Sequence, residues 1–298
     1  MNSFNSIGML KGSNMYRKLI NTLLIVLSVF SINNYVYAES SAVKLDTQPL
    51  TIGLLPHLNI KVLLKVYGPL IKYLEQTLQR KVVVATGPNF HEYYKSSSQG
   101  KYDLYLTAPH HAAYAELHDK ALRLAKFSRP LYSVFLVNKN SRFQTIDDLR
   151  GSVIATPDHL SVIAIVGELT LVQHGLSLKD DVTIKYSDTH SNAMTLVAVN
   201  AVDAAIVGVS AFDKMNKKVT KKLRILTKSN VIPHMMFMAK SEMPSTEYQK
   251  IKKVILDFNA KGKGKKFFSD SVFGDMQGIT DDDMQKLIPL TSILSDRL

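Results

Sequence analysis

From residue 50 onward, short apolar runs alternate with amphipathic stretches. The apolar runs have the length of β-strands, and the stretches between them repeat apolar residues every three or four positions, as one face of a helix does. Leu63, Tyr67, Leu70 and Leu74 show this spacing and predict a helix over about 60–79. Because strands that alternate with helices build sheets covered by helices, the chain is predicted to have an α/β fold.

The apolar runs predict nine strands. They are Leu50–Leu55, Lys81–Ala85, Tyr102–Leu106, Leu131–Val137, Val153–Ala155, Val182–Tyr186, Asp203–Val207, Leu223–Leu226 and Met235–Ala239. A second helix is predicted over Ser161–His174, because Gly175 stands where a helix C-cap needs a glycine. The segment Ser245–Ser295 is predicted to be purely helical.

A weak internal correspondence divides the chain further. Gly100–Asp103 precedes the apolar run Leu104–Leu106, and one hundred residues later Asn200–Asp203 precedes the run Ala204–Val207. Each block reads as a helix end, a turn, an aspartate and a buried strand. The correspondence favours two similar lobes, each with a strand end that opens onto a crevice where α/β sheets bind ligands.

Two β-rich segments that each contain a proline, Ser128–Asn138 and Thr227–Lys240, bracket the middle of the chain. We interpret them as two crossings between a discontinuous first lobe, residues 49–129 plus 238–298, and an inserted second lobe, residues 139–227. No long linker rich in Gly, Ser or Pro separates these lobes. The hinge is therefore predicted to be short and its motion limited.

The first 38 residues have the pattern of a secretory signal peptide. Basic residues without an acid precede a 14-residue apolar run at 19–32, and small residues follow up to Ala38. The alternative, a membrane anchor, needs about 20 apolar residues. We therefore expect cleavage near Ala38 and a soluble protein in the periplasm. The start of translation stays open between Met1 and Met15.

The chain has a net charge of +12 and no cysteine. Without cysteine it forms no disulfide and carries no lipoprotein anchor. Its densest basic runs, Lys214–Arg224 and Lys261–Lys266, lack the interleaved aromatic residues that stack on bases. We interpret both runs as solvated surface and expect no nucleic-acid partner.

No enzyme signature is present. The sequence has no Gly-x-Ser-x-Gly motif, no P-loop and no dinucleotide-binding fingerprint. Asp158, His159 and Ser161 supply the residue types of a triad, but side chains so close along the chain cannot form its chain of hydrogen bonds. The protein is not expected to be an enzyme or to need a cofactor.

The nine histidines raise the alternative of a metal site. No His-x-x-x-His pair occurs, so a local site on one helix is not indicated. His110, His190 and Asp158 could come together only across two lobes, and we expect no metal.

His190 follows the predicted strand Val182–Tyr186 and stands where a helix begins. Helix N-termini favour anions, and a histidine there can donate to a ligand oxygen. Thr107 and His110 follow another strand end at a second helix entrance, so the same rule expects them in a cleft. The alternatives are that Thr189 or Ser191 caps the helix while His190 is exposed, and that Thr107 is also only a cap.

Four segments, in order, carry a resemblance to a known family. They are Pro69–Leu74 with Val82–Val84, Gly100–Pro109, Ser141–Gly151, and Thr189–Ala193 with Asp203–Ala205. Together they resemble the phosphate, phosphite and phosphonate-binding branch of periplasmic substrate-binding proteins. The resemblance covers essentially the whole chain after the signal peptide. It implies a two-lobed Venus-flytrap fold of type II with two hinge crossings.

The resemblance also implies a function. The protein is expected to capture a small anionic or polar solute between its lobes and to deliver it to an ABC permease in the inner membrane. The alternative is a ligand-sensing protein of the same fold that docks on a membrane sensor. We expect a monomer in either case.

The resemblance implies ligand-binding residues, and several differ from the family pattern. Phe90 stands where the family has a pocket tyrosine, and Asp158 and Ser161 lie in the turn that is rich in Ser and Thr in the family. Pro233–Met236 replaces a Pro-Asn-Asp-Pro segment. These differences predict weak binding of simple alkylphosphonates and better binding of a ligand with fewer charges or with a cationic part for Asp158. The predicted ligand-binding set is Phe90, Thr107, His110, Asp158, Ser161, His190 and Asn192.

Overall fold

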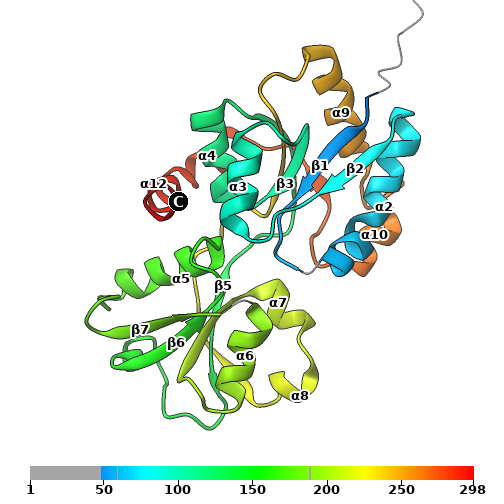
Figure 1. Ribbon diagram of the computed structural model, residues 1–298. Coiled ribbons are helices and arrows are strands. Elements are labelled where there is room, and N and C mark those ends of the chain that lie inside the picture. The colour runs from blue at the N-terminus through cyan, green and yellow to red at the C-terminus, as the bar shows by residue number, and fades with distance from the viewer. Residues whose placement is uncertain (1–47, 59, 188) are drawn as a thin grey trace, which may run out of the picture. The chain divides into compact units, whose positions relative to one another are not determined.

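The computed structural model describes residues 48–58, 60–187 and 189–298, and within them the strands form two mixed sheets (Figure 1). The predicted signal peptide and the two candidate start residues lie outside the described residues. None of the helices in the described part of the chain is long and apolar enough to cross a membrane. The α/β prediction is confirmed.

The first sheet has six strands. In spatial order they are β11 (Met276–Gln277), β4 (Leu122–Phe127), β10 (Met236–Ala239), β3 (Leu104–Thr107), β1 (Leu50–Leu54) and β2 (Val82–Ala85). β1 runs parallel to β2 and β3, whereas β10 runs antiparallel to β3 and β4. The side chains of β3 and β10 are buried along the whole of both strands, because helices cover both faces of the sheet.

The second sheet has five strands. In spatial order they are β7 (Val182–Tyr186), β6 (Ser152–Thr156), β8 (Ala204–Gly208), β5 (Ser133–Asn138) and β9 (Leu223–Lys228). β6 is parallel to β7 and β8, and β5 is antiparallel to β8 and β9. Each of the nine predicted strands is therefore present, with ends that differ by two residues or fewer.

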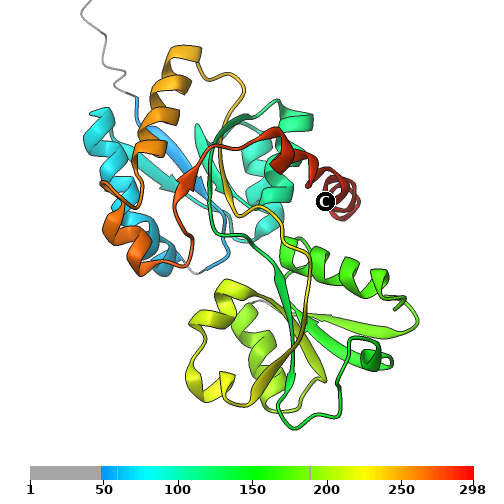
Figure 2. The ribbon, with the colours of Figure 1, turned by 180° about the vertical axis from the view of Figure 1, so that it is seen from behind.

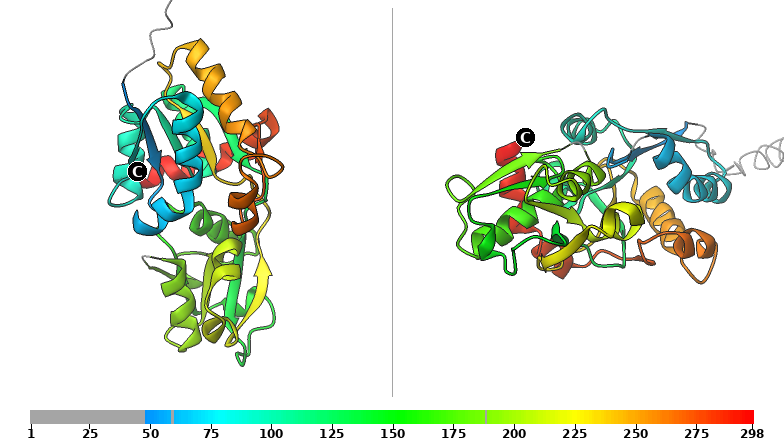
Figure 3. Two further views of the ribbon diagram at one scale, coloured as in Figure 1. Left: turned by 90° about the vertical axis from the view of Figure 1, so that its right-hand side faces the viewer. Right: turned by 90° about the horizontal axis from the view of Figure 1, so that it is seen from below.

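The helices pack on both faces of each sheet (Figures 1 and 3). Around the first sheet, α2, α9 and α10 pack together, and α3, α4 and α12 lie on the other face. α5 covers one face of the second sheet, and α6, α7 and α8 lie together on the other. The bounds are α2 (Ile60–Leu78), α3 (Phe90–Ser98), α4 (Pro109–Asp119), α5 (Val162–Gln173), α6 (His190–Ala198), α7 (Val209–Lys214), α8 (Lys217–Thr220), α9 (Ser245–Asp257), α10 (Lys265–Asp270), α11 (Asp281–Gln285) and α12 (Ile288–Arg297), with a 3-10 turn at Asp147–Leu149.

The two blocks that correspond in sequence make the same contacts in the two sheets. Asp103 Oδ2 accepts a hydrogen bond from the Thr51 amide at 2.8 Å, and Asp203 Oδ2 accepts one from the Val153 amide at 2.8 Å. The amide of each aspartate in turn donates to the carbonyl of the same partner at 3.0 Å. The aspartate thus fixes the register at the start of a buried strand in both sheets.

The chain passes between the sheets twice, from β4 to β5 and back from β9 to β10. Leu131 and Ile232 lie in these two connections and exchange backbone hydrogen bonds of 2.9 and 2.8 Å. Figure 2 shows the connections side by side. The two connections between the sheets are therefore joined at one point.

Two features differ from the sequence-based expectation. The strand β4 was not among the predicted strands, and the segment Ser245–Ser295 is not purely helical because it contains β11. β11 pairs Met276 with Phe127 and Gln277 with Lys126. Both strands depend on partners far away in the sequence, which periodicity within a segment does not reveal.

Candidate functional site

A cavity of about 530 Å³ lies between the two sheets. Its wall comes from loops and helix ends of both. The lining residues are Leu55, His57, Leu58, Phe90, Ala108, Pro109, Leu131, Ser161, Val162, Ile163, Thr189, His190, Ser191, Gly208, Ser210, Ala211, Lys214, Met215, His234, Met235, Val272 and Phe273. The volume falls within the range of about 300–1,000 Å³ that is typical of small-molecule pockets.

Four helices begin at this cavity. The first residues of α3, α4, α5 and α6 are Phe90, Pro109, Val162 and His190, and all four line the wall. The first amides of a helix have no partner within the helix, and together with the helix dipole they make its N-terminus favourable for a negative charge. The convergence of four such ends suits an anion in the cavity.

Side chains cap three of these helices locally. Asn89 accepts from the Glu92 amide at 2.8 Å, Ser161 from the Ile163 amide at 3.3 Å and Thr189 from the Asn192 amide at 3.1 Å. α4 begins without a side-chain cap, behind Ala108. The caps explain why these chain segments turn from strand or loop into helix at the cavity wall.

Three histidines of the wall have fixed tautomers. His57 Nδ1 lies 2.9 Å from the Leu55 carbonyl, which can only accept, so Nδ1 carries the proton. His190 Nδ1 accepts from the Gly208 amide at 3.3 Å, and His234 Nδ1 accepts from the Met235 amide at 2.8 Å. His190 and His234 therefore each carry an Nε2–H donor, whereas Nε2 of His57 is an acceptor.

All three rings are neutral at pH 7. Burial is the main cause: it lowers the pKa of His57 and of His190 to about 4, and that of His234 to about 3. Nearby positive or titrating groups add to this, namely Lys214 for His57, and His57 with Arg129 for His234. His57 and His190 keep part of their surface open to the cavity, but protein atoms enclose the rest of each ring.

Among the described residues that line the cavity, Lys214 is the one Lys, Arg, Asp or Glu. Its ammonium lies 5.7 Å from the centre of the Phe273 ring. Lys214 belongs to the basic run that the sequence suggested was only solvated surface, and this end of the run borders the cavity. The neighbouring Asp213 is paired with Arg129 at 2.8 Å.

The structure brings three of the seven predicted site residues to the cavity: Phe90, Ser161 and His190. Thr189 caps α6, as one of the two sequence-based interpretations expected, and His190 lines the cavity wall. Contact of His190 with a solute stays a prediction.

The other four predicted residues lie outside the cavity wall. Thr107 is fully buried, with Oγ1 2.8 Å from His111 Nδ1. His110 is also fully buried, and its Nε2 lies 3.1 Å from the Leu160 carbonyl. Asp158 accepts from the Leu160 amide at 2.8 Å, and Asn192 is exposed on α6.

Sequence reasoning did not select His57, His234 or Lys214 as site residues. His57 and His234 lie in loops that are far apart in the sequence, and only folding brings them to one wall. The one sequence signal for His234 was the difference from the family pattern at Pro233–Met236, where this chain has a histidine and the family has another side chain. Among the described residues, no group of three His, Cys, Asp or Glu side chains is placed to hold a metal ion.

Comparison with known proteins shows the family to which the chain belongs. The profile of the family described as "ABC transporter, phosphonate, periplasmic substrate-binding protein" matches residues 52–284. No curated protein matches the chain. Among solved structures, PhnD1 of Prochlorococcus marinus in complex with methylphosphonate has a TM-score of 0.74 and 19% identity, over 83% of this chain and 98% of that one.

Two further structures share the fold. A binding protein component of an ABC phosphonate transporter from Pseudomonas aeruginosa has a TM-score of 0.71 and 16% identity, over 84% of this chain and 88% of that one. The alkanesulfonate-binding protein SsuA from Xanthomonas axonopodis pv. citri, bound to MOPS, has a TM-score of 0.59 and 18% identity, over 83% of this chain and 92% of that one. The fold is that of type II periplasmic binding proteins, as the resemblance implied. The chain belongs to the family of periplasmic substrate-binding proteins of phosphonate ABC transporters.

Proposed function

We propose that this protein binds a small anionic or polar solute in the cavity between its two sheets and delivers it to an ABC permease. The convergence of four helix N-termini on one cavity is the observation that carries the proposal. Phe90, Ser161 and His190 are proposed to contact the solute. The other four residues of the predicted set do not line the cavity in this structure, and their contact with the solute stays a prediction: Thr107, His110, Asp158 and Asn192.

Binding is coupled to closure in this proposal. One side of the cavity comes from helices around the first sheet, such as α3 and α4, and the other from α5 and α6 around the second. Neither side alone encloses a solute, so ligand affinity favours the state in which the two sides are close. The paired connections at Leu131 and Ile232 are the proposed hinge.

The proposed location is the periplasm. The pattern of residues 1–38 supports export, and Glu39 would be the first residue after cleavage. Intact-mass measurement on protein from a periplasmic fraction should give a chain that begins near Glu39. Retention of residues 1–38 on membrane-bound material would contradict export.

A thermal-shift screen of anions and small polar solutes on the chain from Glu39, followed by calorimetry, tests solute binding. A true ligand at a hundred times its dissociation constant stabilises the folded state by about 2.7 kcal/mol. For a protein of this size that corresponds to a rise in Tm of about 5–10 °C. His190→Ala should reduce the shift, whereas His174→Ala, at an exposed histidine outside the cavity, should not. A hit that is unaffected by changes in the cavity wall would contradict the proposed site.

A further inference from the structure

We propose that the cavity selects an organic anion with a single negative charge and an apolar body, in preference to a small doubly charged phosphonate. This inference rests on the proposed function, because it concerns the solute of the same cavity. Three observations lead to it: the apolar part of the wall, the unpartnered donors and the scarcity of formal charge.

The first observation is the apolar wall. Four apolar side chains from different parts of the chain line the cavity: Leu55, Leu131, Met235 and Phe273. Together with Phe90 they offer carbon surface to a solute, and a single phosphonate group cannot cover it. Burying apolar surface of the solute against these side chains is favourable in proportion to the area removed from water. The wall therefore favours a solute with an alkyl or aryl body.

The second observation is a set of polar atoms without partners. His234 is 3% exposed, and its Nε2 has no hydrogen-bond partner among the described residues. Ser210 Oγ, also in the wall, is likewise buried and unpartnered. A buried donor without an acceptor is costly, and an oxygen of a bound solute would relieve that cost. These atoms mark where the polar head of the solute would lie.

The third observation is the charge of the wall. The donors of His190 and His234 come from neutral rings, and Lys214 is the one Lys or Arg among the described residues of the wall. Nε2 of His57 is an acceptor, which opposes a fully ionised oxygen beside it. The helix N-termini favour an anion but do not separate one charge from two. A second negative charge would enter an apolar surrounding in which the described lining residues supply no second cation.

Four probes separate the two parts of the inference. Benzenesulfonate and methanesulfonate carry one charge, whereas phenylphosphonate and methylphosphonate carry two at about pH 8.5, above the second pKa of the phosphonic acid. Calorimetry on the chain from Glu39 should give the tightest binding for benzenesulfonate. Replacing phenyl by methyl should weaken binding at least about 30-fold, since several apolar carbons lose their contacts. Replacing sulfonate by phosphonate should weaken it at least about tenfold.

Variants connect the effect to the cavity. His234→Leu keeps a side chain of similar size without the donor and should weaken benzenesulfonate binding about tenfold. His174→Leu removes an exposed histidine outside the wall and should leave it unchanged. If His234→Leu does not fold, Lys214→Met serves instead, because Lys214 is exposed and its loss should weaken both phenyl probes.

Each outcome of these measurements either supports or overturns the inference, and the proposed function is tested separately. Binding of methylphosphonate or phenylphosphonate as tight as that of benzenesulfonate overturns the inference on charge, while it would support solute capture in the cavity. Equal binding of the methyl and phenyl probes overturns the apolar body. Absence of binding by all four probes also overturns the inference. The proposed function then fails only if the wider solute screen finds no ligand.

Discussion

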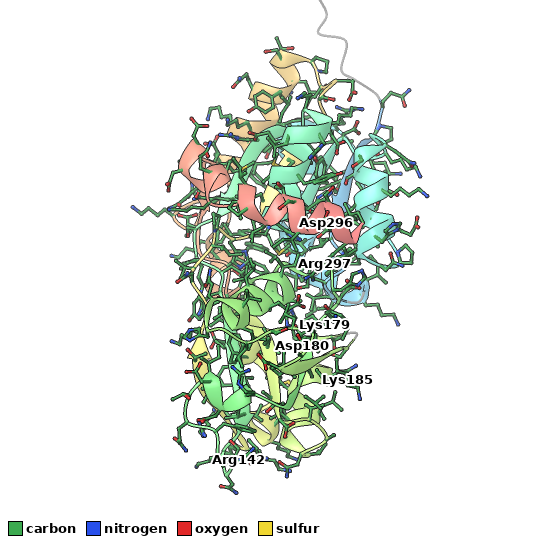
Figure 4. The ribbon with its side chains drawn as sticks, turned by 90° about the vertical axis from the view of Figure 1, so that its left-hand side faces the viewer. Arg142, Lys179, Asp180, Lys185, Asp296 and Arg297 are labelled. Carbon is green, nitrogen blue, oxygen red and sulfur yellow. The ribbon has the colours of Figure 1, made fainter. Side chains whose placement is uncertain are left out.

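Arg297, in the last turn of α12, donates to the buried carboxylate of Glu168 on α5, with 2.5 Å between Nη2 and Oε2. Nη1 of the same guanidinium donates to the His159 carbonyl at 2.6 Å, and the second oxygen of Glu168 accepts from Tyr186 Oη at 2.9 Å. Glu168 is 2% exposed. Figure 4 shows Arg297 at the end of α12, the helix that packs on α4. The ion pair thus ties a helix of the first sheet to a helix of the second.

Loss of this ion pair should destabilise the protein. Arg297→Ala leaves a buried carboxylate without its cation, which typically costs about 3–5 kcal/mol when the partner stays buried. In urea denaturation we expect the free energy of unfolding to fall by at least about 2 kcal/mol. The loss can be smaller than the full cost because opening of the structure would let water reach the Glu168 carboxylate. The double variant Arg297→Ala with Glu168→Gln should recover a large part of it.

An exposed ion pair serves as the control. Lys286 and Asp282 lie 2.6 Å apart on the surface near α11, four residues apart in sequence. Lys286→Ala should leave the free energy of unfolding unchanged within the error of the measurement, because both side chains are exposed to water. Equal effects of Arg297→Ala and Lys286→Ala would show that the buried pair does not hold α12 and α5 together.

Most strands could be predicted because their signal is local. The apolar runs of β1, β7 and β8 are flanked by turn residues, and helix patterns separate them from their neighbours. β4 was missed because Arg123 and Lys126 interrupt its apolar pattern. Their partners lie elsewhere in the chain: Arg123 binds Glu116 and Asp281, and Lys126 binds Asp283. Such pairs become visible only in the folded structure.

His190 should be required for solute binding. It begins α6, faces the cavity and carries a donor at Nε2, because Nδ1 accepts from the Gly208 amide. His190→Ala removes one hydrogen bond to a charged head group and should weaken the affinity for benzenesulfonate at least about tenfold in calorimetry. His118→Ala changes an exposed histidine away from the cavity and should have no effect. An unaltered affinity in His190→Ala would remove His190 from the site.

The candidate site could be predicted only in part, because side-chain packing and contacts between distant segments decide which residues reach the cavity. His190 begins the helix that follows β7, and the structure has it in the cavity wall, where the local pattern predicted it. Thr107 and His110 satisfy the same rule, but their side chains turn into the protein: Thr107 towards His111, and His110 towards the Leu160 carbonyl. Side-chain direction depends on packing, which the strand-end rule does not include. His57 and His234 come from loops without any local motif.

Closure of the cavity should be measurable in solution. Leu131 and Ile232 join the two connections between the sheets by two backbone hydrogen bonds, which would make the proposed hinge short. If the sheets approach each other around a solute, saturating benzenesulfonate should reduce the radius of gyration by about 1 Å in small-angle scattering. Sodium chloride at the same ionic strength is the control for ionic effects. An unchanged radius at saturation would exclude closure and leave the fold intact.

The buried histidines should make the protein sensitive to acid. Burial lowers the pKa of His57 and His190 to about 4, and that of His110 and His234 to about 3, whereas an unfolded histidine has a pKa near 6.5. Below pH 6.5 the unfolded chain therefore binds protons that the folded chain excludes. The free energy of unfolding must fall as the pH falls from about 6.5 towards 4.

Urea denaturation at several pH values between about 6.5 and 5 measures this effect, because most carboxylates stay ionised in that range. Each excluded proton contributes a slope of up to about 1.4 kcal/mol per pH unit, so several histidines should give a slope clearly above that value. His234→Leu should reduce the slope by about one proton, while His174→Leu, at an exposed ring, should not. Positive neighbours such as Lys214 near His57 and Arg129 near His234 act in the same direction as burial. A free energy of unfolding that stays constant over this range would mean that these rings take up protons in the folded state, and the cavity would then hold cationic donors instead of neutral ones.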